Sequence, residues 1–179
     1  MFRIIFFILS LFTFEVWGDT IVENFNSSPE RRWDFFTDQV MGGRSTGKLE
    51  FISSGETNYA RLSGNVTTEN NGGFIQFRAF LQNTLNSKIE GIKLEVRGNN
   101  QKYYLHIRTS GTVLPWQYYS ATFNVDEQWK LVDIPLKQFQ RSGTFMRKYI
   151  KPSSIKSLGV VAYGRNHQAD LEVNKIIFY

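Results

Sequence analysis

The chain has 179 residues, carries a net charge of +5 and contains no cysteine. This length predicts one domain that is large enough to bury a core without covalent cross-links. The lack of cysteine excludes disulfides, thiol nucleophiles, cysteine-ligated zinc and iron–sulfur clusters. Lysine and arginine are spread along the chain, so we expect no nucleic-acid partner.

The N-terminus resembles a secretory signal peptide. A single arginine, Arg3, precedes an apolar run over residues 4–14. A run of this length fits the central region of a signal peptide and is too short to span a bilayer. We predict a signal peptide over 1–18, cleavage near Gly18-Asp19 and export to a periplasm or the exterior. The mature chain, 19–179, is then one domain without a predicted transmembrane helix.

The rest of the chain is predicted to be β-structure. Alternation of apolar and polar side chains, bounded by turn-forming residues, predicts strands at 20–26, 33–40, 47–53, 58–66, 74–81, 92–97, 103–108, 116–125, 129–136, 155–163 and 170–179. Many short strands at this spacing indicate an all-β sandwich or barrel. One short helical turn is expected over 136–139, after Pro135.

The same alternation predicts which side chains face the core. The inward set is Ile75, Phe77, Ala79, Leu81, Ile92, Leu94, Val96, Leu105, Ile107, Tyr119, Ala121 and Phe123. The opposite parity contains Gln76, Arg78, Tyr104, His106, Arg108 and Tyr118. These six side chains favour hydrogen bonding and stacking, so we expect a sheet face that does more than contact solvent.

Two glycine-rich turns interrupt the strands, at 38–45 (D-Q-V-M-G-G-R-S) and 70–74 (N-N-G-G-F). Paired glycines allow a positive φ, and short polar side chains can bond the freed backbone groups. Strand counting predicts that both turns lie at one rim of the sandwich. The loops near 98–101 and 124–127 should lie at that end as well.

The glycine turns contain strings that resemble catalytic motifs. Residues 43–47 match the G-x-S-x-G string of serine hydrolases, but a strand rather than the required helix is expected after Ser45. The same objection applies to a phosphate-binding loop over 42–48. Asp38 and Glu69 border the two turns and are the candidate acid–base pair of a glycosidase, although Asp38 is equally a turn-capping residue.

Metal and cofactor chemistry receives little support from the sequence. His106 and His167 are the only histidines and lack zinc-site spacing. Calcium is left open, because it can use scattered carbonyl and carboxylate oxygens. We predict no catalytic residue, no metal and no cofactor, and therefore a binding protein rather than an enzyme.

Residues 22–178 resemble the complex I intermediate-associated protein family. The resemblance is carried by Trp33, the strings at 38–45 and 70–74, Gly64, Arg78, Gly91-Ile92, Arg97-Gly98, residues 103–108 and Trp116-Gln117. It implies a galactose-binding-like jelly-roll β-sandwich. It also implies a non-enzymatic, chaperone-like role in assembling NADH:ubiquinone oxidoreductase, with membrane-complex subunits as partners.

Two binding hypotheses follow. The first is a protein partner held by the glycine turns and the polar sheet face. The alternative is an exported carbohydrate-binding module in which Tyr104, Tyr118 and Trp116 stack on sugar rings and Arg108 bonds hydroxyls. Together the candidate binding residues are Asp38, Gly42, Gly43, Ser45, Asn70, Asn71, Gly72, Gly73, Arg78, Tyr104, Arg108, Trp116 and Tyr118.

Overall fold

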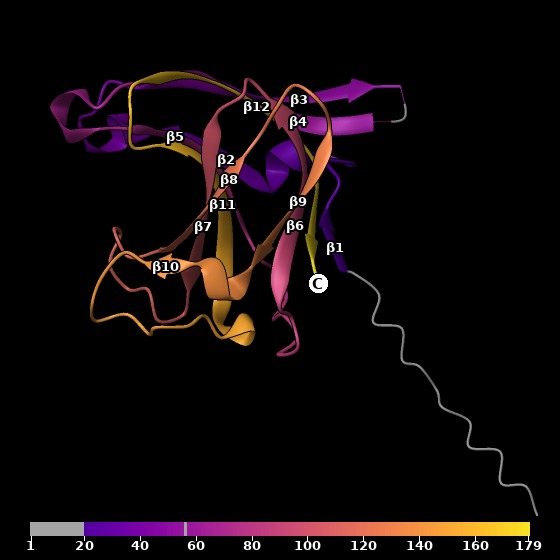
Figure 1. Ribbon diagram of the computed structural model, residues 1–179, viewed down its shortest axis with the longest axis vertical. Helices are drawn as coiled ribbons and strands as arrows, with labels where there is room; N and C mark the ends of the chain where they lie inside the picture. Colours follow the sequence, from indigo (N-terminus) through magenta and orange to yellow (C-terminus); the bar gives the residue numbers. More distant parts are fainter. Residues whose placement is uncertain (1–19, 56) are drawn as a thin grey trace, which may run out of the picture.

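Two antiparallel β-sheets packed face to face form the fold of this computed structural model (Figure 1). The structure describes residues 20–55 and 57–179. The predicted all-β jelly-roll sandwich is confirmed. The predicted signal peptide, 1–18, lies outside the described residues. In the described part of the chain, no helix is long and apolar enough to cross a membrane.

The first sheet has six strands. Its order is β3 (Thr46–Ser54), β4 (Thr57–Val66), β12 (His167–Phe178), β6 (Gly91–Gly98) and β9 (Lys130–Pro135), and β1 (Thr20–Glu23) pairs with β12. The second sheet also has six strands, in the order β10 (Gln140–Arg141), β8 (Tyr119–Asn124), β7 (Lys102–Thr109), β11 (Ile155–Tyr163), β5 (Phe74–Phe80) and β2 (Trp33–Thr37).

Short 3₁₀ segments connect several strands of the described chain: η1 (Pro29–Arg31), η2 (Asp38–Met41), η3 (Glu69–Asn71), η4 (Leu136–Gln138) and η5 (Pro152–Ser154). The helical turn predicted after Pro135 is η4. The predicted strand 33–40 ends at Thr37 because its side chain caps η2 by accepting a hydrogen bond from the Gln39 amide.

The strand predicted over 116–125 begins only at Tyr119. Before it, residues 110–117 form a loop held by side chains. The Gln117 side-chain oxygen accepts the amides of Val113 and Leu114 at 2.8 and 3.0 Å. These local hydrogen bonds take the place of pairing between strands. The alternation of apolar and polar side chains gives no information about such side-chain-to-backbone bonds.

The core lies between the two sheets, where the predicted inward residues meet. Ile75, Phe77, Ile92 and Leu105 are fully buried. Ala79 and Leu81 are only half-buried, since they lie toward one end of the second sheet. Otherwise the predicted inward set is confirmed.

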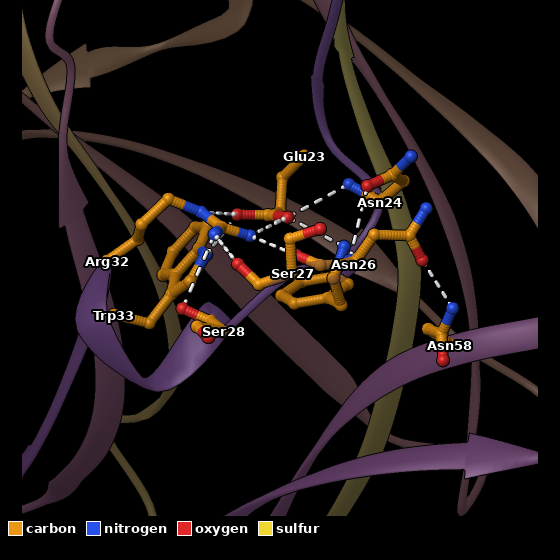
Figure 2. A network of polar contacts seen from close by, with 9 residues as sticks. Glu23, Asn24, Asn26, Ser27, Ser28, Arg32, Trp33 and Asn58 are labelled. Atoms are coloured by element: carbon orange, nitrogen blue, oxygen red, sulfur yellow. Dashed lines mark hydrogen bonds and ion pairs between the residues drawn. The ribbon is translucent and has the colours of Figure 1, made fainter.

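A buried carboxylate closes the N-terminal edge of the sandwich (Figure 2). Glu23 is 5% exposed and accepts hydrogen bonds from the Phe25 amide, the Trp33 indole and the Arg32 guanidinium. Arg32 also donates to the carbonyls of Asn26, Ser27 and Ser28, at 2.8, 2.7 and 3.3 Å.

Three residues of this turn, Phe25, Ser27 and Ser28, have φ between 51° and 60°. Such left-handed backbone is unfavourable for residues other than glycine and needs support from its surroundings. Figure 2 shows Arg32 between Glu23 and the turn, so one guanidinium holds both.

Candidate functional site

The two glycine turns meet at one rim of the sandwich, as predicted. The carboxylate of Asp38 joins them, because it accepts hydrogen bonds from both sides. The amide and hydroxyl of Ser45 donate to it at 2.9 and 2.5 Å. From the other turn, the amides of Gly73 and Phe74 donate at 2.5 and 3.2 Å.

Paired glycines are needed because the turns approach Asp38 closely. A Cβ on Gly43 would collide with the Asp38 carboxylate, and one on Gly72 would collide with the same carboxylate from the other turn. It would also lie 3.0 Å from the Gly43 Cα. Gly42 has φ +89° and Gly73 has φ +132°, values that side-chain-bearing residues rarely adopt.

Asp38 is fully buried, and its environment determines its charge state. Burial alone would raise its pKa, but the hydrogen bonds from Ser45, Gly73 and Phe74 outweigh that effect and lower it. Asp38 is therefore an anion at neutral pH. We assign Asp38 and Ser45 to holding the turns together.

For the exposed residues of the rim, the predicted binding role remains a prediction. Gly42, Asn70 and Asn71 lie at the surface of the turns, with the Asn70 amide 3.4 Å from the Gly42 carbonyl. The 98–101 and 124–127 loops are at the same end, joined by a 3.1 Å bond from the Val125 amide to the Gln101 carbonyl.

The rim geometry does not support hydrolysis. Ser45 is fully buried and leads directly into β3, so its hydroxyl is not presented at a strand-to-helix elbow. Glu69 is 61% exposed and pairs with Arg44 at 3.2 Å, whereas Asp38 is enclosed. These two carboxylates therefore do not flank an open cleft. Among residues 20–55 and 57–179 no group of three metal-ligating side chains occurs.

A second candidate region is the outer face of the second sheet, on the side away from the core. The strand register places Arg78, Gly159 and His106 in one row across β5, β11 and β7. The next row contains Gln76, Val161 and Tyr104. The predicted outward parity of β5 and β7 is thus confirmed.

Rings cluster at the centre of this outer sheet face. His106 stacks on Tyr118 with ring centroids 4.2 Å apart and planes 20° from parallel. Tyr163 meets Tyr104 edge-on at 5.5 Å and His106 at 5.7 Å. Burial lowers the pKa of His106 to about 4, so its ring is neutral at physiological pH.

Arg78 brings a cation to the same face. Its guanidinium lies 4.8 Å from the Phe36 ring centroid and 4.9 Å from that of Phe80. Burial, and then the charge of Arg108, lowers its pKa. The Arg78 Nε and the His106 Nε2 are buried without a hydrogen-bond partner among the described residues. Buried polar groups in folded proteins are nearly always paired, so these two atoms require an explanation.

Two further predicted residues lie beside this face. Arg108 donates to the carbonyls of Thr112 and Leu114 at 3.2 and 3.0 Å, so it holds the 110–117 loop. Trp116 belongs to that loop and is 67% exposed. The structure therefore brings Arg78, Tyr104 and Tyr118 together, with Arg108 and Trp116 at one margin.

The sequence pattern does not identify Tyr163 as a residue of this face. It lies in β11, where every residue from 157 to 162 is buried and the alternation disappears. Counting in twos from Gly159 through Val161 reaches Tyr163, but glycine and valine give no polar signal. Only the pairing of β11 with β5 and β7 shows that Tyr163 belongs to the outer face of the second sheet.

The outer face of the first sheet is different, because its charges neutralise one another. Arg61 forms a two-pronged ion pair with Asp170, both bonds being 2.8 Å long. Arg97 pairs with Glu172, and Lys175 lies 3.5 Å from Glu95. This face already satisfies its polar groups, so the outer face of the second sheet is the stronger ligand-binding candidate.

Several solved structures with the same fold are described as carbohydrate-binding modules. A family 11 module of a cellulosomal cellulase of Clostridium thermocellum superposes with a TM-score of 0.74 at 18% identity, covering 90% of this chain and 94% of the module. The same family 11 module in complex with a β-1,3-1,4-mixed-linked tetrasaccharide gives 0.74 at 18% identity, covering 90% and 95%. A family 30 carbohydrate-binding module gives 0.57 at 14% identity, covering 80% of each chain.

These similarities show the fold. No curated protein matches the sequence. A sequence model of one family does match, over residues 23–173, and it is described as Complex I intermediate-associated protein 30 (CIA30). That match spans the two glycine turns, the outer sheet face and most of both sheets. The chain is therefore a member of the complex I intermediate-associated protein 30 family.

Proposed function

We propose that this protein is a non-catalytic binding module that holds a carbohydrate on the outer face of its second sheet. The observation that carries the proposal is the cluster of Tyr104, His106 and Tyr118 beside a buried, incompletely paired Arg78. The cluster combines ring surfaces with polar atoms that lack partners.

Sugars match this chemistry. A pyranose ring has apolar C–H faces that pack on aromatic rings, and hydroxyls that both donate and accept hydrogen bonds. Arg78 Nε can only donate, whereas the neutral His106 ring has one donor and one acceptor nitrogen. Because both atoms are enclosed by neighbouring side chains, separate ligand hydroxyls would bond them once the covering side chains move aside. The proposal is supported further by the shared fold of modules described as carbohydrate-binding, one of them in complex with a tetrasaccharide.

The test is isothermal titration with soluble β-glucans and a panel of other oligosaccharides. The Tyr118→Ala variant should weaken binding at least tenfold, because truncating a contacting ring removes roughly 1.5–3 kcal/mol. Trp129→Ala is the matched control, since Trp129 stacks with Arg97 on the other sheet and should leave affinity unchanged. Absence of binding to every sugar, or equal affinity of the two variants, would contradict the proposal.

The same titration has an expected pH dependence. Burial holds the pKa of His106 at about 4, below its ordinary value of 6.5. The ring therefore stays neutral from alkaline pH down to moderately acidic pH, and affinity should be constant there. Protonation as pH approaches the shifted pKa would place a cation near Arg78 and abolish the acceptor nitrogen. A fall in affinity centred on the ordinary histidine pKa would count against His106 as a ligand-contacting group.

A second candidate function follows from family membership. We propose as the alternative that the rim holds subunits of NADH:ubiquinone oxidoreductase during assembly. Val40 and Met41, 71% and 67% exposed, lie beside the glycine turn and offer an apolar contact. Normal assembly of that complex in a deletion strain would exclude this role.

We also propose export, which the apolar segment 4–14 supports and which secretion of a tagged chain would test.

A further inference from the structure

The loops at the end of the second sheet opposite the glycine rim gather exposed apolar side chains. Among the described residues, five of the most exposed large hydrophobics belong to the loops 110–117 and 142–154. They are Val113 (81% exposed), Leu114 (41%), Trp116 (67%), Phe145 (100%) and Tyr149 (65%). Isolated exposed hydrophobics are common, but clustering at one end indicates an interaction site.

The two loops lie side by side. The Ser142 hydroxyl donates to the Trp116 carbonyl at 2.9 Å, and the Tyr119 hydroxyl donates to the Arg147 carbonyl at 2.9 Å. The Ser110 amide donates to the Ser154 carbonyl at 2.8 Å. Figure 1 shows the loop that follows β10 at the same end as the turn after β7. We call these two loops the basic end.

The charge at the basic end has one sign. The loop 142–154 contains Arg147, Lys148 and Lys151 and no aspartate or glutamate, and the loop 110–117 contains no charged residue. No ion pair neutralises Arg147 or Lys151 among the residues that the structure describes. The basic end is therefore a region of positive potential on a chain whose other charges are more evenly balanced.

A cavity of about 440 Å³ opens between the two loops. Cations and hydroxyls dominate its lining, which comprises Thr109, Ser110, Gly111, Tyr119, Arg147, Tyr149, Lys151, Ser153 and Ser154. Guanidinium, ammonium and hydroxyl donors together are the groups that bind a phosphate oxyanion. The cavity also lies directly beside the exposed apolar side chains.

We propose that the basic end docks on an anionic phospholipid bilayer, with a headgroup phosphate bound between Arg147 and Lys151 and with Phe145 and Trp116 entering the interface. Tryptophan and other aromatic residues favour the headgroup region, and cations near an anionic leaflet add attraction. An acidic protein would account for the charge, but it would not account for a fully exposed Phe145 at the tip of a cationic loop. The proposal is independent of carbohydrate binding, which uses the sheet face.

The experiment is co-sedimentation of the protein with vesicles. Binding is expected to vesicles of phosphatidylcholine and phosphatidylglycerol in equal amounts, and not to vesicles of phosphatidylcholine alone. The double variant Arg147→Gln/Lys151→Gln should weaken partitioning about 30-fold, since each cation near the surface contributes a factor of about five. Phe145→Ser should weaken it roughly tenfold through lost apolar burial.

Matched controls distinguish the basic end from general surface effects. Arg31→Gln removes an exposed cation on η1, and Leu131→Ser removes a side chain that is 58% exposed on β9. Neither control should change partitioning. Trp116 fluorescence, taken as the difference from Trp116→Phe, should shift to the blue on binding.

Three results would overturn the proposal. The first is no binding to anionic vesicles, and the second is binding that the basic-end variants leave unchanged. The third is binding that inorganic phosphate or heparin competes away while Phe145→Ser has no effect, because this would identify a soluble anion rather than a bilayer. Circular dichroism of each variant confirms that a loss of binding is not a loss of fold.

Discussion

Replacing Asp38 by asparagine is expected to lower the free energy of unfolding by roughly 3 kcal/mol, because an amide group would face donors that now bond a carboxylate. Four donors converge on the two Asp38 oxygens, from Ser45, Gly73 and Phe74. Three of these donors bond Oδ2 and the Ser45 amide bonds Oδ1, so an asparagine with its oxygen at the Oδ2 position would turn an N–H group toward the Ser45 amide and would lose the negative charge that all four donors now bond. Urea unfolding followed by tryptophan fluorescence measures the change.

Glu30→Gln is the matched control for this experiment. Glu30 is exposed on η1, so its replacement should change stability by no more than about 0.5 kcal/mol. Equal stability of the Asp38→Asn variant and the parent would show that the carboxylate does not hold the turns together.

Acid provides an independent measurement of the same contact. Because the pKa of Asp38 is lowered in the fold from its ordinary value of 3.8, the contribution of its charge is fully present above that value. It is lost as pH falls through the lower, folded pKa. The parent should therefore lose stability in this acidic range, and Asp38→Asn should show a flatter profile there.

Replacing Arg32 by methionine is expected to destabilise the protein by about 2–3 kcal/mol, because the buried Glu23 would lose its half-exposed cation. The change also removes the donors to three carbonyls in the turn 26–28. Thermal and urea unfolding measure the loss. Arg31→Gln, next in the sequence and exposed, should have little effect.

A double variant isolates the ion pair from the turn contacts. Adding Glu23→Gln to Arg32→Met removes the uncompensated charge, so it should recover part of the lost stability. A purely additive loss would show that Glu23 and Arg32 do not depend on each other.

The carboxylate oxygens of Glu23 and the carbonyl oxygens of the turn 26–28 are already bonded to the Arg32 guanidinium. Added calcium or a chelator should therefore leave the melting temperature of the parent unchanged.

The sequence predicted the sandwich and the position of the glycine turns because both depend on local signals. Period-two alternation identifies strands buried on one face, and Gly-Gly strings identify tight turns. The inward set around Phe77 and Leu105 followed from the same alternation. Strand counting even placed the two turns together, since successive antiparallel strands alternate their ends.

These local patterns could not predict the contacts between segments that are far apart in the sequence. Asp38 was predicted to cap its own turn, yet two of its donors come from residues 73 and 74. The ion pair between Glu23 and Arg32 was not predicted, because neither residue belongs to a recognised pattern. Tyr163 was missed since its strand is buried on both sides. In all three cases the position of the residue depends on which segments pair with each other, and the composition of a single segment does not show this.

The role of Asp38 changes what the family signature can be used for. Residues 38–45 and 70–74 carry the sequence resemblance, and in the structure Asp38 joins these two turns to each other at one rim of the sandwich. Two relatives can share every letter of those strings and still recognise unrelated molecules. The buried part of the signature, Asp38 and Ser45, is thus a guide to architecture and not to what the protein binds. Specificity should be sought in the side chains of β5, β7 and β11, where exchanges leave the contact between the two glycine turns intact.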